Sequence, residues 1–228
     1  MCIRDRPRNV HVSGPSDGLR SALEERLQRA GAVITDKLEV ADVTIQIDGK
    51  DSCDIAIVPY GSEFSNSGII IELSDVIIPN GGRNWGNGTM RDWVEQIMSG
   101  ENPTLKSENR FWVNVRDVVD AISILCQSDI EKIPEGRYRM CGRRSWEMGD
   151  VIDEIRVLWD RFNNSINHSH TAESLSEIPS PVRGIHSERV EGPELRNIHQ
   201  VLFELGGEGW HPLVPMRVSL MEMIASAQ

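Results

Sequence analysis

The sequence predicts an α/β fold, with a mostly parallel β-sheet first and a smaller, mainly helical part after it. Three features of the chain support this prediction. Short apolar stretches separated by turn residues fill residues 7–82, as in a series of strands. One stripe of apolar residues at helical spacing lies between the first two stretches. From residue 83 onward, most apolar residues recur with the period of a helix.

Residues 10–36 predict a strand, a glycine turn, a helix and a second strand. Val10 and Val12 begin the first strand, and Gly14 and Gly18 bracket the turn. The helix carries one apolar stripe, which consists of Leu19, Ala22, Leu23, Leu27 and Ala30. Gly31 ends this helix, and the second strand covers residues 32–34.

This order of elements is typical of a dinucleotide-binding unit. The turn lets the backbone approach a diphosphate, and the start of the helix offers it free N–H groups and a partial positive charge. An acid about 20 residues after the turn commonly binds the ribose hydroxyls. We therefore predict a cofactor site that consists of Gly14, Ser16, Gly18 and Leu19 at the pyrophosphate and Asp36 at the ribose.

Two residues in the turn work against a bound cofactor. Arg20 occupies the place of a third glycine, and Asp17 brings a negative charge close to the expected pyrophosphate. The prediction requires free backbone amides in the bend, and a guanidinium that filled the bend would contradict it. The alternative is the first turn of an ordinary α/β sheet that binds no cofactor.

Four more apolar stretches follow Asp36. They are the alternating stretch 43–47 and the continuous stretches 55–58, 69–71 and 76–78. Only six residues separate Ile47 from Asp54, whereas a parallel crossover needs about a dozen or more. Either the stretches 43–47 and 55–58 pair antiparallel, or one of them is not a strand, or the sheet is cut down.

The second part of the chain is predicted to contain helices that begin at Thr89, Asn114, Ser145, Pro193 and Pro215. A strand at about residues 137–141 is expected to return to the sheet. Residues 160–192 are rich in Asn, Ser and His and are expected to form a loop. These elements divide the chain into a shortened dinucleotide-binding-like region, 7–82, and a mainly helical region, 83–228, that shapes a substrate cleft.

Composition excludes several classes of function. The net charge of −11 argues against nucleic-acid binding. No apolar stretch of about 18 residues is present, so we expect no membrane span. The cysteines are scattered, which is typical of reduced thiols in a cytoplasmic protein. The histidines, at positions that include His168, His170, His186 and His199, lack the spacing of metal ligands, so no metal is expected.

Three segments resemble one family, the extended short-chain dehydrogenases/reductases, which include the nucleotide-sugar epimerases and dehydratases. The segment 110–121, RFWVNVRDVVDA, resembles their R-D-F-V-Y-V-x-D-V-V-x-A. The segment 71–79, IELSDVIIP, is similar to L-R-L-S-N-V-Y-G-P, with Asp75 in place of the usual asparagine. The segment 205–212, LGGEGWHP, is similar to L-G-W-x-P with inserted residues.

The resemblance implies a shortened Rossmann-like fold, NAD or NADP as cofactor, a nucleotide-sugar ligand and a homodimer. It also implies that Arg110 contacts a nucleotide-sugar phosphate, although a surface salt bridge is an equal alternative for this residue. Asn84, Arg183 and Arg189 are further candidates for the same cleft.

The family performs proton transfer with a Y-x-x-x-K pair on one helical face, and this chain lacks it. The chain has two tyrosines. Tyr60 is followed four residues later by Phe64, and Tyr138 by Gly142. Tyr60 is the one candidate catalytic residue. The sequence thus predicts a diverged NAD(P)-binding, epimerase/dehydratase-like protein with impaired catalysis. The alternative is a non-catalytic protein that binds a nucleotide or nucleotide sugar, or serves as a scaffold.

Overall fold

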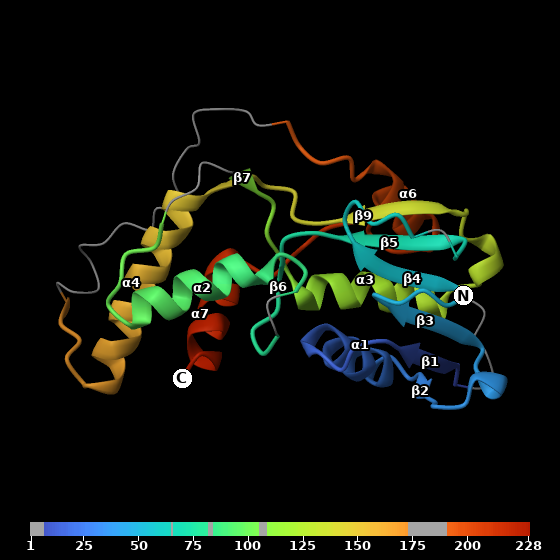
Figure 1. The fold of residues 1–228 in the computed structure, drawn as a ribbon, viewed down its shortest axis with the longest axis horizontal. Coiled ribbons are helices and arrows are strands. Elements are labelled where there is room, and N and C mark those ends of the chain that lie inside the picture. The colour runs from blue at the N-terminus through green and yellow to red at the C-terminus, as the bar shows by residue number, and fades with distance from the viewer. Residues whose placement is uncertain (1–6, 65, 82–83, 105–108, 173–190) are drawn as a thin grey trace.

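The computed structural model describes residues 7–64, 66–81, 84–104, 109–172 and 191–228. Its main feature is a parallel sheet with the strand order β2-β1-β3-β4-β5-β9. The sheet lies at one end of the molecule and a group of helices at the other (Figure 1). The α/β class and the mostly parallel sheet predicted from the sequence are confirmed.

The first three elements follow the predicted order. β1 (Asn9–Ser13) leads into α1 (Gly18–Arg29), and β2 (Val33–Ile34) returns parallel to β1. Leu19, Leu23 and Leu27 of α1 are fully buried, since they occupy one face of the helix against the sheet. Gly31 has a positive φ of 87°, which ends the helix in a conformation that glycine adopts without strain.

The strands β3 (Val43–Ile47), β4 (Ile55–Pro59) and β5 (Ile69–Leu73) are parallel neighbours. Ile45 pairs with Ile55, and Ile55 pairs with Ile69. Of the three alternatives for this region, the cut-down sheet is therefore the one that the structure adopts. The described residues that connect these strands contain no helix.

The two faces of the sheet are covered differently. The helices α1, α3 (Val115–Gln127) and α6 (Arg196–Glu204) pack on one face and form with it the larger apolar cluster, which we call the sheet core. On the other face Ala56, Val58 and Ile70 are buried, and Cys53 and Phe64 from the connecting segments pack against them. These short connections thus replace helices as the cover of this face.

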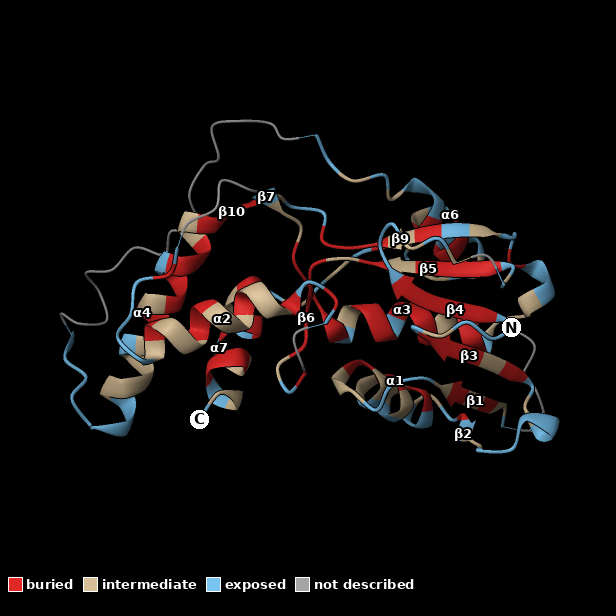
Figure 2. Ribbon diagram, viewed as in Figure 1, coloured by how far each residue is buried: buried red, intermediate tan, exposed pale blue. Residues whose placement is uncertain are grey.

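A second apolar cluster, the helical core, consists mainly of side chains from α2 (Asn87–Met98), α4 (Met148–Ile166) and α7 (Met216–Ser226). The fold also contains two small ribbons, of which the first contributes to both cores and the second lies beside α4. The first is parallel, of β6 (Val76–Ile77) and β8 (Val113–Asn114), and the second antiparallel, of β7 (Asn109–Arg110) and β10 (Trp146–Glu147). Figure 2 shows buried residues concentrated in the sheet and on the facing sides of these helices.

The chain returns to the sheet after the first helices. The helix α3 and the short 3-10 helix Ile130–Lys132 lead to β9 (Gly136–Met140), which pairs with β5. The predicted returning strand is thus confirmed. Another 3-10 helix, Leu38–Val40, connects β2 to β3. The division of the chain at residue 82 stays a prediction.

The boundaries of three helices differ from the expected ones. The helix α2 begins at Asn87 rather than Thr89, because Gly86 adopts a left-handed φ of 80° and starts the helix earlier. The helix α4 begins at Met148 rather than Ser145, because residues 146–147 pair with β7. It continues to Ile166, past the predicted loop boundary at residue 160. The helix α6 begins at Arg196 rather than Pro193.

Within the described residues, no helix is long and apolar enough to span a membrane.

Candidate functional site

The candidate site lies at the carboxyl edge of the sheet, where the strand order reverses. The strand β1 has β2 on one side and β3 on the other, so connections leave it in opposite directions. Ligands of open α/β sheets bind in the crevice at such a point. The turn after β1 begins with Gly14, whose φ is 121°. A Cβ atom at this residue would clash with the carbonyl oxygen of Ile47 in β3, so the close approach of the two strand ends requires glycine.

The start of α1 is capped by the carboxylate of Asp17. Its Oδ1 accepts a hydrogen bond from the backbone N–H of Arg20 at 3.0 Å. Its Oδ2 accepts one from Nε1 of Trp85 at 3.1 Å. A negative charge of the protein itself therefore occupies part of the helix N-terminus where a diphosphate would bind.

Arg20 reaches the glycine turn, as its position in the sequence indicated. Its Nη1 donates to the carbonyl oxygen of Gly14 at 3.0 Å, and its Nε pairs with Glu24 at 2.7 Å. The guanidinium therefore lies at the bend, which is an arrangement that counts against the cofactor prediction. Within the described part of the chain, the backbone N–H groups of Gly18 and Leu19 have no hydrogen-bond acceptor. These two amides keep the donors that a diphosphate would need, while the position of Arg20 opposes one.

Gly18 is required by packing as well. A Cβ atom there would lie 2.7 Å from Cγ2 of Ile78 and 2.9 Å from Cα of Gly81. The segment that follows β6 therefore folds directly over the start of α1. Trp85 belongs to the same segment, and its bond to Asp17 fixes the two parts together.

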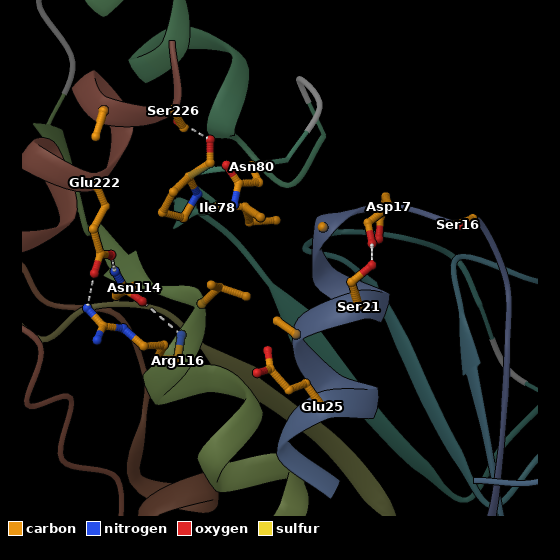
Figure 3. A pocket seen from close by; sticks show the side chains of 15 residues that line it. Ser16, Asp17, Ser21, Glu25, Ile78, Asn80, Asn114, Arg116, Glu222 and Ser226 are labelled. Carbon is orange, nitrogen blue, oxygen red and sulfur yellow. Dashed lines mark hydrogen bonds and ion pairs between the residues drawn. The ribbon is translucent and has the colours of Figure 1, made fainter. Parts of the chain in front are cut away.

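A cleft of about 910 Å³ opens beside this turn. Figure 3 shows α1 on one side of it, with the start of α3 and the end of α7 on the other. Ser16 and Gly18 of the predicted cofactor site line the cleft, together with Pro79 and Asn80 after β6. The fold thus brings the glycine turn next to three segments that are distant from it in the sequence.

The charged side chains that line this cleft are mostly acidic. They are Asp17, Glu25, Glu222 and Arg116. Arg116 forms an ion pair with Glu222 at 2.5 Å. Asn114 accepts a bond from the backbone N–H of Arg116 at 2.8 Å and donates to Ser219 at 3.0 Å and to Glu222 at 3.3 Å. An anionic ligand in this cleft would meet one cation that is already paired.

The other predicted cofactor residues lie apart from the cleft. Leu19 is fully buried in the sheet core, so only its backbone can face a ligand. Asp36 is exposed two residues after β2 ends. These positions leave the cofactor site a prediction.

Arg110 is held by the protein itself. Its Nη1 pairs with Oδ1 of Asp75 at 3.1 Å, and 32% of its side chain is exposed. Asp75 is buried, adopts a positive φ of 54° and also accepts the backbone N–H of Phe111 at 2.9 Å. The salt bridge offered as the alternative for Arg110 is therefore present. Asn84 is exposed in the segment before α2. Arg183 and Arg189 lie outside the described residues.

Tyr60 directly follows β4 at the carboxyl edge. The residue is 53% exposed, and the guanidinium carbon of Arg139 lies 3.8 Å from the centre of its ring. Residues 60–64 are not helical, and Phe64 packs on the face of the sheet opposite α1, α3 and α6. The geometry that a tyrosine–lysine pair needs on one helical face is therefore absent at this position.

The described thiols do not form a nucleophilic centre. Burial raises the pKa of Cys126 to about 12 and that of Cys141 to about 11. Both thiols are therefore protonated at neutral pH, and a protonated thiol is a poor nucleophile. Among the described residues, no group of three or more His, Cys, Asp or Glu side chains could hold a metal ion.

Comparison with known proteins identifies the fold. No protein-family model matches the sequence, and no curated protein matches it. The structure is similar to RMD from Pseudomonas aeruginosa in complex with NADPH, with a TM-score of 0.61, 12% identity, and coverage of 97% of each chain. It is similar to WbmF from Bordetella bronchiseptica in complex with NAD+ and UDP, with a TM-score of 0.59, 12% identity, and coverage of 97% of this chain and 92% of that one.

A third similar structure is the UDP-glucose 4-epimerase of Thermus thermophilus in complex with NAD. Its TM-score is 0.53 at 13% identity, with coverage of 96% of this chain and 98% of that one. The chain has the same Rossmann-like fold as these three structures.

Proposed function

We propose that this protein binds NAD or NADP at the turn between β1 and α1, as a diverged relative of the nucleotide-sugar epimerases and dehydratases. The observation that carries the proposal is the turn itself. It lies at the reversal of the strand order, begins with a glycine that a side chain cannot replace, and leaves two amides at the start of α1 without acceptors among the described residues. Structures of the same fold contain NADPH, NAD+ or NAD.

In this proposal Gly14, Ser16, Gly18 and Leu19 hold the pyrophosphate and Asp36 the ribose. A bound nicotinamide would supply hydride transfer. A nucleotide sugar is the proposed second ligand, because WbmF of the same fold was solved with UDP. Arg110, Asn84 and Arg189 are the proposed contacts to it. Since Asp75 already pairs with Arg110, we expect Arg110 to make a weaker phosphate contact than an unpaired arginine would.

We further propose that turnover by the family's usual route is lost. Tyr60 has no lysine partner at the fourth residue and lies outside any helix. Proton transfer from a sugar hydroxyl needs a positioned base of suitable pKa, and no described pair of residues matches the tyrosine–lysine arrangement. The free cysteines 53, 126 and 141 fit the reducing environment of the cytoplasm, where we propose that the protein acts.

The second candidate function is a scaffold that binds no dinucleotide. Asp17 favours it, because this carboxylate caps α1 and faces the region where a pyrophosphate would lie. The carboxylate of Asp17 and a pyrophosphate are both negative and would repel each other, and the repulsion is strongest where water is excluded. Removal of the Asp17 charge should therefore strengthen dinucleotide binding if the protein binds a cofactor, and should have no effect on binding if it is a scaffold.

The test uses Asp17→Ser, which keeps a capping side chain but removes the charge. Binding of NAD+, NADH, NADP+ and NADPH is measured by calorimetry and by thermal unfolding. A ligand at 100 times its Kd stabilises the folded state by about 2.7 kcal/mol. We expect at least one dinucleotide to bind the wild type and to bind the Asp17→Ser variant more tightly. The exposed Asp160→Asn change on α4 serves as the control and should leave binding unchanged.

Absence of binding by both the wild type and the Asp17→Ser variant would contradict the proposal and leave the scaffold. Where a cofactor binds, UDP- and dTDP-sugars are added and the absorbance of the reduced nicotinamide is followed. We expect no change. An absorbance change would contradict the loss of turnover, and the Tyr60→Phe variant would then show whether Tyr60 carries it.

A further inference from the structure

A second cavity, of about 410 Å³, lies between α4 and α7 and shares no residue with the cleft beside α1. We call it the α4–α7 groove and define it by Leu158, Arg161 and Phe162 of α4 and Arg217, Met221 and Ile224 of α7. Residues separated by three, four or seven positions share one face of a helix. The groove is therefore formed by one face of each helix.

Four of the eight described residues that line the groove are apolar, and Ser165 and His170 lie beside the two arginines as further polar groups. Leu158 and Ile224 are buried members of the helical core, and Phe162 packs against that core and stacks on Trp159, with the ring planes at 14°. Met221 is 53% exposed and lies at the opening. An apolar tail that entered the groove would cover Met221 and contact Leu158, Phe162 and Ile224.

Two arginines bring positive charge to the groove. Nε of Arg217 donates to Oε1 of Glu154 at 2.6 Å, and Glu154 is fully buried. That ion pair compensates the charge of Arg217. Arg161 has no ion pair with any residue in the described ranges, so the groove carries a net positive charge from this pair of arginines.

Both arginines have buried donors that are not satisfied. Nη2 of Arg217 and Nε of Arg161 are shielded from solvent and have no acceptor among the described residues. Buried donors without acceptors are rare in folded proteins, since each one loses its hydrogen bonds to water. An acceptor in the groove would reach these two atoms after a rotation of the guanidinium groups, which is open to Arg217 because 32% of its side chain is exposed.

We propose that the α4–α7 groove binds an amphipathic anion with one carboxylate and an unbranched apolar chain. The carboxylate binds the guanidinium groups of Arg161 and Arg217, whose planar forks match its two oxygens. The chain lies along Leu158, Phe162, Met221 and Ile224. The volume is within the range of small-molecule sites, about 300–1,000 Å³, which are typically apolar with a few polar groups.

The probe is decanoate, and its binding to the full chain is measured by calorimetry below the concentration at which it forms micelles. Decyltrimethylammonium and decanol carry the same tail with a positive or neutral head. We expect decanoate to bind, with at least tenfold higher affinity than decanol, and the cation not to bind. Equal affinity for the three ligands would overturn the proposal, because the groove would then recognise only the tail. No binding of decanoate would also overturn it.

The variants separate the head from the tail. Arg161→Met keeps a long apolar stem and removes the charge, and we expect at least a tenfold loss of decanoate affinity. Arg156→Met is the matched control, since Arg156 is on the same helix but pairs with Asp153 outside the groove. Unchanged affinity in Arg161→Met, or an equal loss in both variants, would overturn the assignment of the head.

Met221→Glu places a carboxylate at the opening and should abolish binding, and the fold should tolerate it because Met221 is exposed. Arg217 is changed only to Lys, which keeps a charge opposite Glu154, and we expect a smaller loss than in Arg161→Met. Thermal unfolding of each variant, compared with the wild type, separates loss of the ligand from loss of the fold. Binding to Met221→Glu with unchanged affinity would overturn the placement of the tail.

Discussion

Asp17 shows how one side chain can serve the fold at the expense of a ligand. Its carboxylate caps α1 and accepts from Trp85, so it joins the glycine turn to the segment after β6. The same carboxylate brings negative charge to a helix N-terminus, where an anion would otherwise be stabilised. A residue that stabilises the free protein therefore lowers the affinity expected for a dinucleotide.

Gly14 provides a prediction at the same scale. Gly14→Ala forces a positive φ on a residue with a Cβ and drives that atom into the backbone of β3. We expect the free energy of unfolding to fall by about 3 kcal/mol or more. Chemical denaturation measures this loss.

Gly31→Ala is the control for this change. Gly31 also has a positive φ, of 87°, but a Cβ there would meet no atom within 4 Å. We expect a loss of about 1–2 kcal/mol from backbone strain alone. Equal losses in the two variants would contradict the argument that the contact with β3, and not the backbone conformation, requires glycine at residue 14.

Arg110 shows where residue-level reasoning from the sequence reached its limit. The resemblance implied a phosphate contact, while the structure pairs this arginine with Asp75. The sequence contained a signal for the pair, because Asp75 replaces an uncharged asparagine in the similar segment. The sequence alone does not show that Asp75 and Arg110 are in contact, because they are 35 positions apart. The pairing of β6 with β8 brings them together.

At the scale of elements, α3 and the segment before α7 are joined by Asp117. This carboxylate accepts from the backbone N–H groups of Leu213, at 2.8 Å, and Val214. Burial raises the pKa of Asp117 above its ordinary value, and the two backbone donors only partly oppose the effect. The folded state therefore takes up this proton more readily than the unfolded state does.

The raised pKa of Asp117 fixes the sign of a pH dependence. Where the folded state binds more protons, stability falls as pH rises. The Asp117 contribution should therefore be most favourable below about pH 3.9, the ordinary value, and should decrease as pH rises through the raised pKa. We expect the free energy of unfolding of the wild type, relative to Asp117→Asn, to decrease between pH 3 and 7. Urea denaturation across this range measures the difference, and an increase would contradict the prediction.

Most helices and strands could be predicted because their apolar periods are local. The stripes of α1 and α3 each span several turns, and Asn114 caps α3 as expected from its position. The start of α2 could not be predicted, because it depends on the left-handed conformation of Gly86 and on hydrogen bonds between the side chain of Asn87 and the backbone of Ile78. The pairing of β3 with β4 also depends on the sheet as a whole.

The candidate sites were predictable to different degrees. The glycine turn could be found because its residues are adjacent in the sequence. The α4–α7 groove could not, because it requires Phe162 to be helical, and the sequence placed residues 160–192 in a loop. The sequence did contain one indication of the groove. Apolar residues occur on more than one face of α7, and one of them, Met221, is exposed in the structure.

At the scale of the whole molecule, Asn114 connects the sheet core to the helical core. Its side chain caps α3, which packs in the sheet core, and donates to Ser219 of α7, which packs in the helical core. Asn114 is buried, with 2% of its surface exposed. The connection between the two cores therefore depends on a buried polar contact in addition to apolar packing.

Asn114→Ala removes both the cap and this connection. We expect a loss of about 2–4 kcal/mol in the free energy of unfolding, from the helix cap and from the lost hydrogen bond to the buried Ser219 hydroxyl, which keeps only its bond to the carbonyl of Pro215. Ser219→Ala leaves the cap intact and should cost about 1–2 kcal/mol. Denaturation followed by circular dichroism and by tryptophan fluorescence measures the free energy of unfolding of both variants. An equal loss in the two variants would contradict a capping role for Asn114.

The two outer strands of the sheet determine whether the sheet can grow beyond one chain. β2 has two residues, so it offers few backbone groups to another strand. β9 is longer, but it carries Arg137, which pairs with Glu72, and Arg139, which lies over Tyr60. Short or charged edges discourage a second molecule from adding its own strand and starting a fibril. Any self-association of this protein should therefore use surfaces other than a continuous intermolecular sheet.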